Sequence, residues 1–149
     1  MTTAPSPSAA LAQHWCVLSA LHEGIADHIG RRLEAEHGLS VREFSLLTVL
    51  NRQEAGRHLQ MRQVAEAIVL SQSATTRLVT RMEDRGLLER TICADDRRGI
   101  YTDVTEAGHA LLEAARSTHD RALAEALDNA RKNPEFEPLV EALERIGDR

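Results

Sequence analysis

The stretch 61–104 constrains the fold of this chain most strongly, because its hydrophobic pattern changes there from helical to extended. Apolar residues recur at helical spacing over 61–68, and Ser71 then offers an N-cap oxygen for a second helix. Gly86 stands where a helix of residues 72–85 would end in the left-handed conformation. Because only two residues separate the first helix from Ser71, the two helices must cross steeply, as in a helix-turn-helix.

The second of these helices is expected to have one apolar stripe and one polar face without acids. Ala74, Leu78 and Met82 recur every fourth residue, so this stripe must be buried. No Asp or Glu occurs before Glu83, whereas an ordinary solvated face interleaves Glu with Lys. Such a face suits the base edges and flanking phosphates of a DNA major groove. We therefore expect DNA contacts from the polar side chains of this helix, which are Gln72, Ser73, Thr75, Thr76, Arg77, Thr80 and Arg81.

A β-hairpin is expected directly after this helix. Two segments rich in β-forming residues, LLERTIC and IYTDV, flank the turn ADDRRG, which places Asp96, Arg97 and Arg98 at the tip. A solvated turn would account for such a tip. Two adjacent arginines after a DNA-reading helix are better explained as a minor-groove contact, because the negative potential of that groove attracts Arg. Asp96 would then pair with an arginine and hold the tip in shape.

The run DDRRGIYTDVTEAGHALL resembles the wing and the following helix start of the multiple-antibiotic-resistance regulator (MarR) family. The family pattern is Asp-x-Arg, a strand, then Leu-Thr-x-x-Gly. Asp96, Arg98, Thr105 and Gly108 match this pattern, while Val104 replaces the usual Leu. The order of helices and the length of the chain also agree. The resemblance implies a mainly α winged helix-turn-helix with a small β-wing, an obligate dimer, operator binding, and a small aromatic ligand or an oxidant as the usual signal.

Amphipathic helices are expected on both sides of the central stretch. Residues 1–8 read as a flexible Pro/Ser tail, and 9–37 as one long helix with a near-heptad apolar stripe. Ser40 and Glu43 form a capping box that starts a helix apolar over most of its circumference. Residues 105–149 read as a second long helix and a short last one.

The terminal helices carry more apolar surface than a small DNA-binding head needs for its own core. We expect 9–149 to be a single domain, in which 9–37 and 105–149 pair with a second copy of the chain around a winged-helix head of residues 40–104. Two-fold symmetry would place two DNA-reading helices one DNA turn apart, so the operator should be an inverted repeat. Repression is the commoner activity in the family that the chain resembles.

The overall charge of −5 is unevenly distributed along the chain. Residues 57–101 hold eight arginines against six acidic residues, so the expected head is positive and the remainder is strongly acidic. This distribution favours specific contact with double-stranded DNA through the head. No stretch has the length and composition of a membrane span or a signal peptide, so a cytoplasmic protein without membrane partners is expected.

The signal that such a regulator would sense has two candidate sites. In the family that the chain resembles, small aromatic acids bind between the dimer helices and the head. Trp15, His22 and Phe44 are therefore candidate pocket residues, although a lone His on an apolar stripe is usually a core residue. Alternatively, oxidation of Cys16, with or without Cys93, would make a thiol-based peroxide sensor.

Two observations weigh against the thiol sensor. The tyrosines that activate the thiolate in the peroxide-sensing branch have no counterpart here, since Ala20, Gly30 and Val41 stand at the expected positions. Isolated cysteines in a reducing compartment are also usually inert apolar residues.

Other functional classes find little support in the sequence. The seven histidines are scattered without the tight spacing of a dedicated zinc site, so no metal and no cofactor are expected. A Gly-rich phosphate loop, a nucleophile elbow and a metal-ligand pair are missing from the sequence, so an enzyme is not expected. A scaffold that binds only proteins would leave the acid-free face of residues 72–81 without a purpose.

Overall fold

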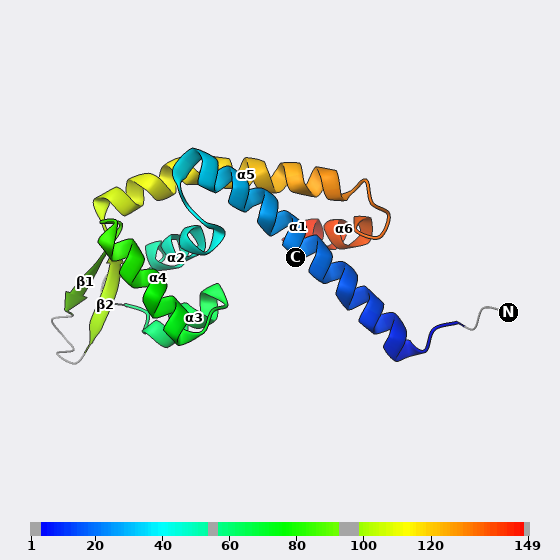
Figure 1. The fold of residues 1–149 in the computed structure, drawn as a ribbon, viewed down its shortest axis with the longest axis horizontal. Coiled ribbons are helices and arrows are strands. Elements are labelled where there is room, and N and C mark those ends of the chain that lie inside the picture. The colour runs from blue at the N-terminus through cyan, green and yellow to red at the C-terminus, as the bar shows by residue number, and fades with distance from the viewer. Residues whose placement is uncertain (1–3, 54–56, 93–98, 148–149) are drawn as a thin grey trace. The chain divides into compact units, whose positions relative to one another are not determined.

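The computed structural model describes residues 4–53, 57–92 and 99–147 as a helical chain with one antiparallel hairpin (Figure 1). The elements, in chain order, are α1 (Pro7–His37), α2 (Val41–Asn51), α3 (Met61–Ile68), α4 (Gln72–Asp84), β1 (Leu88–Ile92), β2 (Ile100–Val104), α5 (Glu106–Ala130) and α6 (Glu137–Arg145). This architecture confirms the predicted mainly α winged helix-turn-helix. Among the described residues, no helix is both long and apolar enough to cross a membrane.

The chain divides into two compact units. One unit comprises Met1–Arg32 and His119–Arg149, and the other, which we call the head, comprises Leu33–Thr118. The head therefore includes the last turns of α1 and the first half of α5, which is more than the predicted 40–104. The long helix α1 also begins at Pro7, so the predicted tail of residues 1–8 ends earlier than expected.

The core of the head is made by side chains from each of its helices. The fully buried large side chains include Leu33, Leu46, Leu47, Met82 and Leu112. The helix α2 lies centrally and packs against both α3 and β2, as its nearly continuous apolar surface predicted. Its capping box forms as predicted, because the Glu43 backbone N–H donates to Ser40 Oγ over 3.1 Å and the Ser40 backbone N–H donates to Glu43 Oε1 over 2.9 Å.

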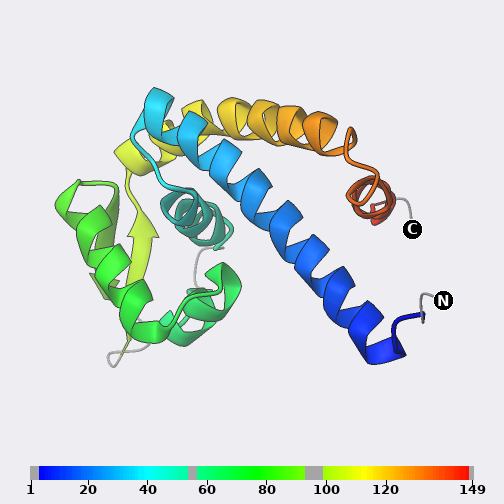
Figure 2. The same cartoon turned by 45° about the vertical axis from the view of Figure 1, so that its right-hand side comes forward.

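The helix-turn-helix and the hairpin follow one another within the head. Three residues, 69–71, connect α3 to α4. The two helices pack against each other, and β1 starts shortly after the end of α4 (Figure 2). In the hairpin, Leu88 pairs with Val104 and Ile92 with Ile100. Gly86 has a φ of 74° and takes the left-handed conformation that its position after α4 predicted.

The start of α5 explains why this part of the sequence reads Thr-x-x-Gly. The Thr105 hydroxyl donates to the Gly86 carbonyl over 2.6 Å and accepts from the Gly108 backbone N–H over 3.1 Å. A Cβ atom on Gly108 would lie 2.2 Å from the Leu87 carbonyl oxygen and 2.7 Å from Val104 Cγ1. Only glycine therefore lets α5 begin this close to the base of the hairpin.

The other unit has a smaller core, and its apolar surface is only partly covered. Leu21, Ala130 and Val140 are buried there, and partly buried side chains of α1, α5, α6 and the turn between α5 and α6 pack around them. On α1, Leu11 and Trp15 are 69% and 66% exposed, although both belong to the predicted apolar stripe. Leu143 and Ile146, in and just after α6, are also exposed.

A charged cluster joins α1 to α5 in the same unit. His28 Nε2 lies 3.0 Å from Glu125 Oε2, and Arg32 donates to the same oxygen over 3.1 Å. The hydrogen bond from His28, more than the charge of Arg32, holds the pKa of Glu125 below its ordinary value, while partial desolvation acts in the opposite direction.

Candidate nucleic-acid interface

The helix α4 presents the acid-free face that the sequence predicted. Ser71 caps its start by accepting from the Ala74 backbone N–H over 3.2 Å. Leu78, Val79 and Met82 are buried against the rest of the head. The side chains that remain exposed on this helix before Glu83 are Gln72, Ser73, Thr76, Arg77, Thr80 and Arg81. One face of α4 is thus polar, cationic and accessible.

Thr75 does not belong to this face, so its predicted DNA contact is wrong. It is fully buried, and its hydroxyl donates to the Ser71 carbonyl over 2.9 Å. Thr75 lies four residues before Val79 and seven before Met82, which places it on the buried stripe of a helix. Helical spacing alone would have predicted that Thr75 is buried, but its hydroxyl group led to the assignment of Thr75 to the polar face.

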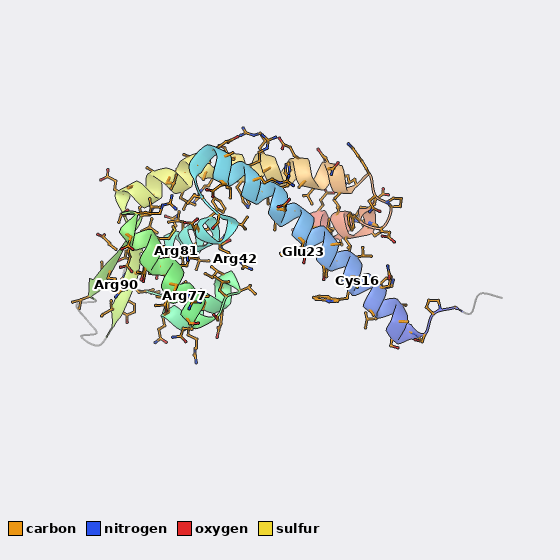
Figure 3. The ribbon with its side chains drawn as sticks, in the orientation of Figure 1. Cys16, Glu23, Arg42, Arg77, Arg81 and Arg90 are labelled. Carbon is orange, nitrogen blue, oxygen red and sulfur yellow. The ribbon has the colours of Figure 1, made fainter. Side chains whose placement is uncertain are left out.

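The arginines on and near α4 fall into two groups, those with an ion-pair partner and those without one. Arg77, Arg81 and Arg90 are labelled in Figure 3. Arg85 pairs with Glu43 over 2.6 Å, and Arg90 Nε donates to Glu83 Oε1 over 3.0 Å. Arg77 and Arg81 are exposed, and neither has an ion-pair partner among the residues that the structure describes. These two guanidinium groups are therefore available to an external anion.

The pairing of Arg90 with Glu83 matters for the charge of the interface. Glu83 carries the first carboxylate along α4, and its oxygen is engaged by a cation from β1. Its negative charge is therefore locally compensated, although exposed ion pairs of this kind contribute little to stability. The face from residue 72 to 81 keeps a net positive charge.

Hydrogen bonds also fix how the threonine hydroxyls on this face can act. Thr76 Oγ1 donates to the Gln72 carbonyl over 2.9 Å, and Thr80 Oγ1 donates to the Thr76 carbonyl over 3.0 Å. With their protons directed at the helix backbone, both hydroxyls present lone pairs outward. They can accept hydrogen bonds from the exocyclic amino groups of adenine or cytosine in a major groove.

The tip of the hairpin lies outside the described residues. This applies to Asp96, Arg97 and Arg98, for which minor-groove contact was predicted, and also to Cys93. The two strands below the tip are described, and Ile92 and Ile100, which pair at their far end, are 77% and 68% exposed. The hairpin thus extends from the head as a two-stranded arm.

The three candidate ligand residues are divided between the two units. Trp15 and His22 lie on one face of α1, where they line a surface hollow of about 430 Å³ together with Leu18, Ser19 and Glu23. Phe44 is buried in the core of the head. His22 is exposed, so it is not the core residue that a lone His on an apolar stripe usually is.

Cys16 is an exposed free thiol on α1 (Figure 3). No group of three or more His, Cys, Asp or Glu side chains within the described ranges is arranged to hold a metal ion.

Comparison with known proteins agrees with this geometry. A model of the MarR family matches residues 37–99. The chain is 30% identical over 131 residues to the HTH-type transcriptional regulator MhqR of Bacillus subtilis (strain 168), a match that covers 88% of this chain and 87% of that protein. It is 31% identical over 85 residues to the HTH-type transcriptional regulator PecS of Dickeya dadantii (strain 3937), which covers 57% of this chain and 51% of PecS.

Solved structures of regulators share the fold. Sco3205, a MarR family regulator of Streptomyces coelicolor solved in complex with DNA, gives a TM-score of 0.73 at 24% identity and covers 96% of this chain and 87% of its own. CouR from Rhodococcus jostii RHA1, bound to p-coumaroyl-CoA, gives 0.68 at 27% identity and 87% coverage of both chains. Dimer assembly is typical of these proteins, and the relatives are transcriptional regulators rather than enzymes. With its helix-turn-helix, its two-stranded wing and this relationship over most of its length, the chain belongs to the MarR family of DNA-binding transcriptional regulators.

Proposed function

We propose that the protein is a homodimeric repressor that occupies an inverted-repeat operator and leaves it when a small ligand binds. The observation that carries the proposal is the exposed face of α4, which holds no carboxylate before Glu83 and presents Arg77 and Arg81 without ion-pair partners in the described part of the chain. Exposed cations next to short hydrogen-bonding side chains match the phosphates and base edges of a major groove. The solved complex of Sco3205 with DNA supports this use of the fold.

We assign the DNA contacts by side-chain chemistry. Arg77 and Arg81 reach bases or phosphates, and Gln72, Ser73 and Thr76 reach bases. Thr80 accepts hydrogen bonds at the edge of the same surface, because its hydroxyl proton is directed at the Thr76 carbonyl. For the wing we assign minor-groove contact to Arg97 and Arg98, and an ion pair with one of these arginines to Asp96.

Dimerisation is supported by the exposed apolar side chains of the unit outside the head. Leu11, Trp15 and Leu18 line one side of α1, and Leu143 and Ile146 are exposed in and just after α6. A contiguous apolar surface of this kind marks an interaction site on a soluble protein. A second copy of the chain would cover it and set the two heads one DNA turn apart.

A small organic ligand is the signal that we favour. CouR is bound to p-coumaroyl-CoA, and DNA binding by BpsR of Bordetella bronchiseptica is regulated by 6-hydroxynicotinic acid. In this chain, Trp15 and His22 line an open hollow that offers an aromatic surface and a titratable ring. An aromatic acid bound there would act on the proposed dimer surface.

The exposure of Cys16 supports a thiol switch as the second candidate. An accessible thiolate can be oxidised to a sulfenic acid, and a reductant would restore it. Titration of the operator before and after an organic hydroperoxide, and again after dithiothreitol, separates the two signals. Loss of binding that dithiothreitol reverses assigns the signal to a cysteine, whereas unchanged binding leaves the organic ligand.

The function is tested by fluorescence anisotropy of the DNA upstream of the protein's own gene at fixed salt. We expect Arg77→Ala and Arg81→Ala each to cost about 1–3 kcal/mol of specific binding and to flatten the salt dependence. Arg116→Ala is the matched control, because Arg116 is an exposed arginine of α5 that pairs with Glu113 over 3.2 Å. Equal affinity of all three variants and the parent protein would refute the proposed role of α4.

A further inference from the structure

The segment between α2 and α3 is bound to the second strand of the wing through a histidine. His58 Nε2 lies 3.0 Å from Asp103 Oδ1 and 3.3 Å from Oδ2, and the Thr91 hydroxyl donates to Asp103 Oδ2 over 2.7 Å. Because Thr91 lies on β1 and Asp103 on β2, the carboxylate joins both strands of the hairpin to His58. The side chains of His58 and Asp103 are only 17% and 33% exposed, so water competes weakly for this contact.

The ring of His58 also supports the wing by stacking. It stacks on the ring of Tyr101, with 4.8 Å between the ring centroids and 24° between the ring planes. A Cβ atom on Gly99 would come within 2.5 Å of the Tyr101 ring, so this ring lies directly against the backbone of Gly99. Gly99 is the residue next to Arg98 in the sequence. A chain of contacts therefore runs from His58 through Tyr101 to the residue that follows the two wing arginines.

A second tie lies beside the first and uses an amide. Gln53 Nε2 donates to the Thr102 carbonyl over 2.9 Å, and Gln53 Oε1 accepts from the Leu59 backbone N–H over 2.8 Å. Both ends of the Gln53 amide are thus engaged, one by β2 and one by the segment that carries His58. The position of this segment relative to the wing is consequently defined by contacts on both sides of His58.

The polarity of His58 indicates that these contacts serve more than stability. Its Nδ1 atom is buried and has no hydrogen-bond partner within the described residues. A buried nitrogen without a partner is unfavourable. A locally unfavourable feature of this kind is typical of functional positions.

We propose that His58 is a positioning residue for DNA binding, because it holds in place the two strands that lead to Arg97 and Arg98, the arginines for which minor-groove contact is proposed. Through Asp103 it fixes the two strands, and through Tyr101 it fixes the backbone next to Arg98. Its contribution to affinity passes through the wing arginines and not through its own contact with DNA. The inference rests on the proposed role of those arginines, and the experiment below separates the two claims.

The test is a double-mutant cycle on operator affinity at fixed pH and salt. His58→Phe keeps an aromatic ring for stacking and removes the donor to Asp103, and it is made both in the parent and in an Arg97→Ala/Arg98→Ala background. We expect His58→Phe to weaken operator binding about fivefold or more in the parent, within the usual range of coupling between sites. In the arginine-free background we expect no further loss, because there is no wing contact left to position.

Three further variants complete the design. His58→Gln places an amide N–H near the position of the imidazole Nε2–H and should restore part of the affinity, and Gly99→Ala, which displaces the Tyr101 ring, should reproduce the loss. His109→Phe makes the same change at an exposed position of α5 and should leave affinity unchanged. Thermal midpoints of all variants are measured under the same conditions, and affinities are compared at a temperature at which every variant is folded.

Each outcome decides between the two claims. If the Arg97→Ala/Arg98→Ala substitutions leave operator affinity unchanged, both the proposed wing contact and the positioning role of His58 are refuted. If that removal weakens binding but His58→Phe does not, the wing contact stands and the positioning role is refuted. A loss from His58→Phe that is equally large in both backgrounds also refutes positioning, since a general structural defect would add to the loss of the arginines.

Discussion

Val69, in the turn of the helix-turn-helix, has a backbone conformation that β-branched residues rarely adopt. Its φ is 58° and its ψ is 51°, which is the left-handed helical region, and its side chain is 75% exposed. The left-handed conformation costs an L-residue roughly 1–2 kcal/mol, and the valine side chain gains little by burial here. The turn is nevertheless closed by the Val69 N–H to the Ala65 and Glu66 carbonyls.

We predict that Val69→Gly stabilises the protein. Relief of the left-handed strain should exceed the entropy cost of glycine in the unfolded chain, for a net gain of up to about 1 kcal/mol. Val69→Ala keeps the Cβ atom and should gain less. Thermal unfolding at one fixed protein concentration measures both, and a lower midpoint for the glycine variant would show that the valine side chain makes a stabilising contact.

Glu125 gives a prediction with a defined sign of pH dependence. The hydrogen bond from His28 lowers the pKa of Glu125 from its ordinary value of 4.5, so the folded state favours the carboxylate. The stabilisation is present above pH 4.5 and is lost as the pH falls through the lower folded pKa. Carbon-13 NMR titration should therefore show this pKa rising toward 4.5 in His28→Ala, and an unchanged value would contradict the assigned cause.

The comparison of Thr75 with its neighbours shows what the sequence determines at the scale of a residue. Periodicity placed Leu78 and Met82 correctly in the core, because burial of apolar side chains follows helical spacing. Thr75 was misplaced, because a threonine hydroxyl can be satisfied by the backbone of its own helix and then be buried without a further partner. The side-chain contact of His58 with Asp103 was not predicted, because hydrophobic periodicity and capping signals identify elements but not the side-chain partners between them.

At the scale of elements, the junction between the wing and α5 depends on one glycine. We predict that Gly108→Ala destabilises the protein by roughly 1–3 kcal/mol, because the new methyl group would overlap the Leu87 carbonyl oxygen and Val104. Gly24→Ala is the matched control. Gly24 also lies inside a long helix, but a Cβ atom there meets nothing within 4 Å. Alanine at this position should therefore raise the free energy of unfolding by roughly 0.5–1 kcal/mol, because its helix propensity is higher than that of glycine. Equal denaturation midpoints for both variants would contradict the close approach at Gly108.

The elements themselves were largely predictable, because each carries its own local signals. Ser40 and Ser71 cap α2 and α4 as expected, and Gly86 ends α4 in the left-handed conformation. The division into units was not predictable from the sequence. The head extends along α1 and α5 because tertiary contacts link the ends of these helices, such as the 2.7 Å contact between His37 Nε2 and the Thr118 hydroxyl.

At the scale of the whole molecule, repression from an inverted-repeat operator requires two heads that act together on one DNA site. In the proposed dimer, the exposed apolar side chains of α1 and α6 would form the surface for a second copy, and the acid-free face of each α4 would make one half of the DNA contact. If either the dimer or the contact by α4 is wrong, the pattern of protein contacts along the DNA differs from the one predicted below. A single measurement can therefore test both parts.

That measurement is dimethyl sulfate methylation interference on the upstream operator, which modifies N7 of guanine in the major groove and N3 of adenine in the minor groove. We predict interference from guanine N7 in two symmetric clusters about one helical turn apart, where the two α4 helices lie. Adenine N3 should interfere outside these clusters, where the wing tips reach the minor groove. A single guanine cluster, or interference from adenine N3 alone, would contradict a dimer that reads the major groove with α4.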